Sequence, residues 1–265
     1  MRALREGQVS SDLTAEHLAP DLLEDSSSVA AQKLLDDTEY LATYKNLLSG
    51  FLASANFSNG NWYTNMWPAC RKETTSPAVL VVGRATRGQW SERIDRADFP
   101  VERAIDTAAR KDMGWVDLVR SQYIRTALAI VEALPSEFRG EAGSASLDIV
   151  WSDLYKIARE NNPTSREMSI QGALGTGALL AREVEVLKPK VVLAFTQSYS
   201  RKDQTAVGGW FEDIMGECRR VVNRPSAAPL TTRIHDVPCI VGVHPQAGPS
   251  RNQYVSDALR TLELS

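Results

Sequence analysis

The chain has 265 residues, 43% of them hydrophobic, and a formal net charge of −3. A chain of this length and composition can bury a sizeable core, and its longest apolar runs are too short to span a bilayer. Because the acidic N-terminus lacks the basic and then apolar pattern of a leader, we expect a cytoplasmic protein without membrane contact.

The three cysteines, Cys70, Cys218 and Cys239, are widely separated and form no C-x-x-C pair. This spacing argues against a disulfide framework and against a zinc site. No metal or other cofactor is expected. The net negative charge disfavours a broad nucleic-acid surface, because affinity for phosphates usually comes from clustered Lys and Arg. A local basic face remains compatible with that charge.

Residues 1–28 are polar and acidic, and they are expected to form a weakly ordered N-terminal arm before a domain at 29–265. Apolar residues at three- and four-residue steps predict a helix over 30–53. The next segment, 56–68, is rich in Asn, Gly and aromatic residues and indicates an ordered loop that lines a cleft.

Short apolar runs after Pro77 predict four strands, each bounded by turn or polar residues. Their ranges are 79–82, 147–151, 191–195 and 238–243. Helical periodicity predicts helices over 123–134, 166–187, 210–222 and 254–264. Strands that alternate with helices favour a three-layer αβα fold with a four-stranded, mainly parallel sheet.

Ligands of such sheets bind beyond the carboxyl ends of the strands, so the residues that follow each strand are candidates for a site. Asp153 follows the second strand, where it could bind a ligand or cap a turn. The segment 161–166 could bind a phosphate, although capping of the next helix is the commoner role. His244 follows the fourth strand beside Pro245, and Ser250 is placed to cap the last helix.

In this order, the strand-end loops resemble the uracil-DNA glycosylase superfamily over residues 78–265. The His244-Pro245 pair with Ser250 is similar to the family's His-Pro-Ser motif, with Gln246 in place of the serine. Asp153 stands where the family has a base-reading Asn. The first loop carries Arg84, Ala85 and Thr86 where family members usually have an acid or amide that positions water.

The resemblance implies an enzyme that flips a nucleotide out of DNA and hydrolyses its N-glycosidic bond. His244 would donate to the base oxygen O2 as negative charge develops on the leaving base. Trp90, Trp62 and Trp67 are candidates for stacking on the base, and Asp153 or Asp112 for orienting the water.

Asp153 points to a cytosine-type base. An ionised carboxylate has only acceptors, so it accepts from the N4 amino group of cytosine and repels O4 of uracil. Its second oxygen would face cytosine N3, another acceptor, so the pair needs one shared proton. Since excision of ordinary cytosine would harm the host, a modified cytosine in phage DNA is the expected substrate, and anti-phage defence the expected role.

DNA is the expected partner, and no obligate protein partner is inferred. The residues expected to contact DNA lie in the strand-end loops: Gly83, Arg84, Thr86, Arg87, Lys156, Gln246, Ser250 and Arg251, with Arg159 as a further basic residue. Two alternatives stay open. One is a noncatalytic DNA- or nucleotide-binding protein of the same fold, which the missing first-loop acid favours; the other is a nucleoside or small-molecule hydrolase, which the net charge favours.

Overall fold

The structure is a computed structural model. It describes residues 29–54, 62–64, 77–84, 92–94, 99–100, 102, 122–139, 149–159, 163–200, 205–207, 209–219, 229–245 and 250–263. The arm predicted at 1–28 therefore lies outside the described residues. Within them, no helix is both long and apolar enough to cross a bilayer.

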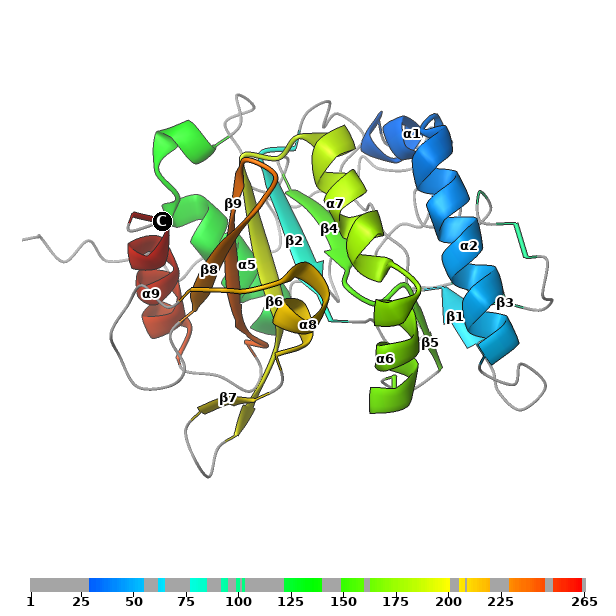
Figure 1. Ribbon diagram of the computed structural model, residues 1–265. Helices are drawn as coiled ribbons and strands as arrows, with labels where there is room; N and C mark the ends of the chain where they lie inside the picture. Colours follow the sequence, from blue (N-terminus) through cyan, green and yellow to red (C-terminus); the bar gives the residue numbers. More distant parts are fainter. Residues whose placement is uncertain are drawn as a thin grey trace, which may run out of the picture.

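A mixed sheet lies at the centre of the fold, with strands in the order β4-β2-β6-β9-β8 (Figure 1). Its strands are β4 (Ile149–Asp153), β2 (Val79–Gly83), β6 (Val191–Ser200), β9 (Val237–Val243) and β8 (Leu230–Ile234). The first four are mutually parallel, and β8 is antiparallel to β9. Beyond the sheet, β6 pairs with the short β7 (Thr205–Val207).

All four predicted strands are present and parallel, but the prediction of four strands in the sheet was wrong, because β8 adds a fifth. The sequence of β8, LTTRI, is too polar to stand out as an apolar run, as is common for a strand at a sheet edge. Strand β4 also begins and ends two residues later than predicted. The shift matters because it places Ser152 and Asp153 inside the strand.

Helices cover both faces of the sheet (Figure 1). On one face, Leu80 and Val82 share a core with α1 (Val29–Leu35), α2 (Thr38–Ser54), α6 (Ser165–Ala173), α7 (Thr176–Leu187) and α8 (Trp210–Met215). On the other face, Val79 and Val81 pack against α5 (Gln122–Ala133) and α9 (Arg251–Glu263). Strand residues buried on both faces explain why the strands read as continuous apolar runs.

Three predicted helices are shorter or divided. The helix predicted over 30–53 breaks at Asp37, whose carboxylate accepts from the Tyr40 backbone N–H at 2.7 Å and caps α2. Gly175, with φ +95°, separates α6 from α7, and Gly216, with φ +92°, follows the end of α8. Periodicity alone carries no signal for such breaks.

A second, antiparallel sheet has the order β3-β1-β5. Its strands are β3 (Glu92–Ile94), β1 (Trp62–Thr64) and β5 (Ile157–Arg159). The segment predicted as a loop over 56–68 therefore contains a strand, and its other residues lie outside the described part. A 3-10 turn, η4 (Ser136–Phe138), follows α5.

Candidate active site

Four of the predicted site residues lie at the carboxyl ends of the parallel strands: Gly83, Arg84, Asp153 and His244. Gly83 ends β2 and lies in register with Asp153 at the end of β4 and with Phe195 in β6. His244 follows β9, and its backbone N–H donates to the Gln197 carbonyl of β6 at 2.9 Å. Residues far apart in the sequence are thus brought to one edge of the sheet, where α/β proteins bind ligands.

Gly83 and Asp153 are in close contact. A Cβ at Gly83 would lie 2.6 Å from Asp153 Oδ1 and 3.3 Å from the Tyr123 hydroxyl, so a side chain here would displace the carboxylate. Asp153 is only 3% exposed. The glycine thus leaves room for the Asp153 carboxylate, and its own carbonyl accepts from the Leu154 N–H at 2.8 Å.

His244 packs face to face on Tyr123, with ring centroids 5.1 Å apart and planes inclined by 7°. Burial, and secondly the positive charge of Arg84, lower the pKa of His244 to about 4. The imidazole is therefore neutral near pH 7 and has one N–H donor and one acceptor nitrogen.

Arg84 directly follows β2, and its guanidinium lies 4.7 Å from the centroid of the Trp210 ring. Burial lowers the pKa of Arg84 from its ordinary value, although the group stays charged. Its carbonyl accepts from the Tyr155 N–H at 3.0 Å, which ties the first loop to the second. Burial, followed by the charge of Asp213, raises the pKa of Tyr155 to about 12 despite the opposing charge of Arg84.

Strand β6 is irregular where it passes the site. Its register with β9 shifts between Ala194 and Gln197. Within this irregularity, the buried Thr196 hydroxyl has no hydrogen-bond partner among the described residues. Such bulges change the direction of side chains near the ends of sheets. Periodicity predicts Tyr123 and Trp210 only as the first residues of two helices, and it gives no signal for Thr196.

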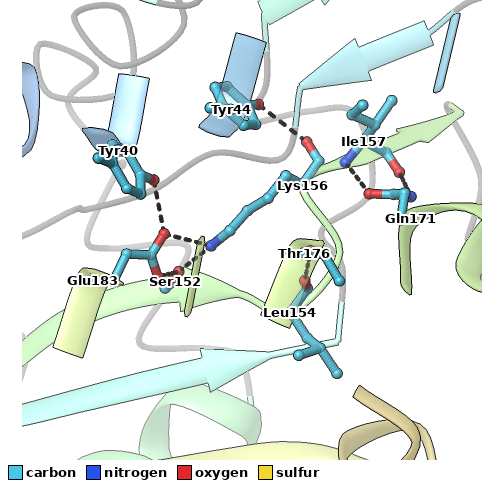
Figure 2. A network of polar contacts seen from close by, with 9 residues as sticks. All are labelled: Tyr40, Tyr44, Ser152, Leu154, Lys156, Ile157, Gln171, Thr176 and Glu183. Atoms are coloured by element: carbon cyan, nitrogen blue, oxygen red, sulfur yellow. Dashed lines mark hydrogen bonds and ion pairs between the residues drawn. The ribbon is translucent and has the colours of Figure 1, made fainter. Parts of the chain in front are cut away.

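Lys156 is not part of a DNA-contacting rim, so that prediction was wrong. The side chain is fully buried, and its Nζ lies 2.6 Å from Glu183 Oε1 and donates to Ser152 Oγ at 2.7 Å. The Ser152 hydroxyl donates to Glu183 Oε2 at 2.6 Å, and the Tyr40 hydroxyl donates to Oε1 at 2.8 Å (Figure 2). The ammonium group of Lys156 is therefore ion-paired and hydrogen-bonded inside the core.

The same network holds the turn after Asp153 (Figure 2). Thr176 donates to the Leu154 carbonyl at 2.6 Å, and the Gln171 side chain bonds both backbone groups of Ile157. The Tyr44 hydroxyl donates to the Lys156 carbonyl at 3.4 Å. Backbone polar groups that loops usually leave to water are here satisfied by buried side chains, which makes the turn rigid.

Trp62 cannot stack on a flipped base in this arrangement, so its predicted role was wrong. Its side chain is fully buried; Phe51 meets the ring edge-on at 5.1 Å, and the Arg159 guanidinium lies 4.6 Å from its centroid. Arg159 is also paired with Glu167 at 2.9 Å. Both residues therefore belong to the second sheet and its packing on α2.

Two helix caps are confirmed. Thr164 caps α6 in a reciprocal arrangement with Glu167, so capping is the observed role within 161–166. The exposed Ser250 accepts from the Gln253 N–H at 3.4 Å, and Arg251 is exposed at the start of α9. Several other predicted site residues lie outside the described part of the chain: Trp67, Thr86, Arg87, Trp90, Asp112 and Gln246.

Among the described residues, no cluster of three or more His, Cys, Asp or Glu side chains has the arrangement of a metal site. In sequence comparisons, no protein-family model matches the chain. No curated protein matches it either.

Proposed function

We propose that the chain is a DNA glycosylase that hydrolyses the N-glycosidic bond of a modified, cytosine-type base. The observation that carries the proposal is the gathering of Asp153, Arg84 and His244 at the carboxyl ends of the parallel strands, around a glycine that leaves room for the carboxylate. The resemblance of the same loops to the uracil-DNA glycosylase superfamily supports it.

In the proposed reaction the C1′–N1 bond breaks, a hydroxyl from water adds to C1′, and the proton of that water goes to the departing base. Negative charge grows on the base during bond cleavage, so donors and positive charge that face the base favour the transition state. The neutral imidazole of His244 retains one N–H for the base oxygen O2. The nearby charge of Arg84 both opposes protonation of His244 and favours the negative charge on the base.

Asp153 is the proposed reader of the base. One carboxylate oxygen accepts from the exocyclic amino group of cytosine, and the other shares a proton with N3. Support comes from the rigidity of the strand end: β4 pairs with β2 up to Asp153, and the next three residues are held by buried hydrogen bonds. A fixed carboxylate discriminates between donors and acceptors better than a mobile one.

The test uses duplex oligonucleotides that carry one uracil, one cytosine, or one 5-hydroxymethylated or glucosylated cytosine, with alkaline cleavage of abasic sites as the readout. The wild-type protein should release only a modified cytosine. Asp153→Asn should lose most of this activity and gain excision of uracil. The control Asp236→Asn alters an exposed acid in the turn at the opposite end of the sheet, and it should behave as the wild type.

Unchanged cytosine-type excision by Asp153→Asn, without any gain on uracil, contradicts the assignment of Asp153. Binding of DNA without release of any base favours the noncatalytic alternative. The first-loop sequence Arg84-Ala85, which lacks an acid, favours the same alternative. Release of base from free nucleosides but not from DNA favours a nucleoside hydrolase. An anti-phage role is checked by plaque counts, which should fall only for phages with modified cytosine.

A further inference from the structure

Tyr123 lies between the two residues proposed to act on the base. It stands in the first turn of α5, on the sheet face that also carries Trp151 and Phe195. Its ring centroid lies 5.6 Å from that of Trp151 and 5.5 Å from that of Phe195, with planes inclined by 54° and 81°. Two aromatic neighbours in different orientations leave the tyrosine ring little freedom to turn.

The Tyr123 ring stacks on the imidazole of His244. The two planes are nearly parallel, so the tyrosine fixes the plane in which both imidazole nitrogens lie. The backbone of His244 is fixed separately by its hydrogen bond to the Gln197 carbonyl. A side chain that is fixed at both its backbone and its ring presents its N–H in one direction, as orientation of a donor requires.

The hydroxyl of Tyr123 lies near Asp153. Both the hydroxyl and Oδ1 of Asp153 fall within 3.3 Å of the position that a Cβ would take at Gly83, so the two oxygens converge above this glycine. Burial, and then the negative charge of Asp153, raise the pKa of Tyr123 well above its ordinary value. The phenol therefore keeps its proton and can donate it towards a carboxylate.

We infer that Tyr123 is a positioning residue of the proposed active site: its ring holds the His244 imidazole, and its hydroxyl faces the carboxylate of Asp153. The inference rests on the proposed function for its consequence in catalysis. The arrangement of the three side chains is independent of that function. A single tyrosine would thus set the geometry of the leaving-group donor and the protonation of the base reader together.

The experiment compares Tyr123→Phe, which keeps the ring, with Tyr123→Leu, which removes it. The imidazole nitrogens of His244 are titrated by NMR and assigned with His244→Asn. The ionisable groups near the pair are Arg84 and Asp153 at the strand ends and Tyr254 on α9. These groups are unchanged in both variants, so a difference between the variants reports on the ring.

In the wild type and in Tyr123→Phe, His244 should titrate with a pKa of about 4. In Tyr123→Leu the imidazole loses its cover and its pKa should rise towards that of a free histidine. Excision by Tyr123→Leu should fall about 10- to 100-fold in kcat with a smaller change in KM, because the donor is misdirected. If Tyr123→Leu does not fold, Tyr123→Met replaces it.

Tyr123→Phe tests the hydroxyl. Without this donor, Asp153 should hold its proton to higher pH, so the alkaline limb of kcat/KM should move to higher pH. An unmoved limb overturns the role of the hydroxyl. An unchanged His244 titration together with unchanged kcat in the ring-less variant overturns the role of the ring. If the wild type excises no base, the proposed function fails, while the His244 titration still decides whether Tyr123 holds the imidazole.

Discussion

Ser152 and Asp153 are neighbours at the end of β4, yet their side chains enter opposite faces of the sheet and very different surroundings. The Ser152 face is closed: Lys156, Glu183 and Tyr40 are buried, and their polar atoms satisfy one another. The Asp153 face holds Tyr123 and lies beside the loop that carries His244. One face fixes the backbone, and the other carries the residues proposed to act on the base.

On the closed face, the buried charges fix the geometry of the backbone. A buried ion pair adds little net stability, because removing both charges from water costs about as much as their attraction returns. Its value here lies in the geometry, since Ser152 and Lys156 bracket Asp153 and the turn that follows it. The pair is therefore a device that stabilises one conformation of the turn.

The largest effect is expected on the closed face. Lys156→Met leaves the Glu183 carboxylate buried without its cation, and should lower the free energy of unfolding by about 3–5 kcal/mol. Denaturation with urea, followed by circular dichroism, measures this loss.

The matched control is the double variant Lys156→Met/Glu183→Gln, which removes both charges but keeps an acceptor for the Tyr40 hydroxyl. It should be more stable than Lys156→Met alone. A single variant within 1 kcal/mol of the wild type, or a double variant that is less stable than the single one, would show that the closed face is not organised by this ion pair.

For the Asp153 face, the prediction is that stability depends on pH. The unfolded histidine takes up its proton near pH 6.5, whereas folded His244 does so only at a pKa of about 4. Between these values the unfolded state binds more protons, so stability is lost as the pH falls. Relative to His244→Asn, the wild type should lose up to about 3 kcal/mol between pH 7 and pH 4.

Denaturation curves at several pH values check this dependence. His235→Asn is the control, because His235 is exposed and its φ of +52° suits asparagine. The wild type loses a certain amount of stability on acidification relative to His244→Asn. His235→Asn should lose the same amount relative to the double variant His235→Asn/His244→Asn. Equal pH dependence of wild type and His244→Asn contradicts the burial of a neutral imidazole.

A smaller loss of stability is expected at Gly83, beside Asp153. Gly83→Ala places a methyl group 2.6 Å from Asp153 Oδ1 and should destabilise the protein by about 1–3 kcal/mol while displacing the proposed reader. Excision should fall together with stability. Gly172→Ala, a helical position where the new Cβ meets Ile214 at 3.7 Å, should be neutral or stabilising by up to about 1 kcal/mol. Equal behaviour of the two variants would refute the contact at Gly83.

Much of the sheet was predictable, because strands buried on both faces leave uninterrupted apolar runs such as 79–82 and 191–195. The edge strand β8 left no such run, and the divisions at Asp37 and Gly175 depend on single caps that periodicity does not register. The placement of Asp153 and His244 at one sheet edge followed from the rule for parallel strands.

The amino-acid sequence by itself determined the class of fold, the four parallel strands and the chemistry available at their ends, since these depend on local composition and order. Only the tertiary structure decided which residues predicted to contact DNA are buried instead. In the sequence, Lys156 and Trp62 resemble surface residues of a binding loop. In the structure, Lys156 is buried against Glu183, 27 residues away, and the Arg159 guanidinium from another strand covers Trp62. It also brought Tyr123 to His244, because packing across a sheet joins residues that no spacing along the chain relates.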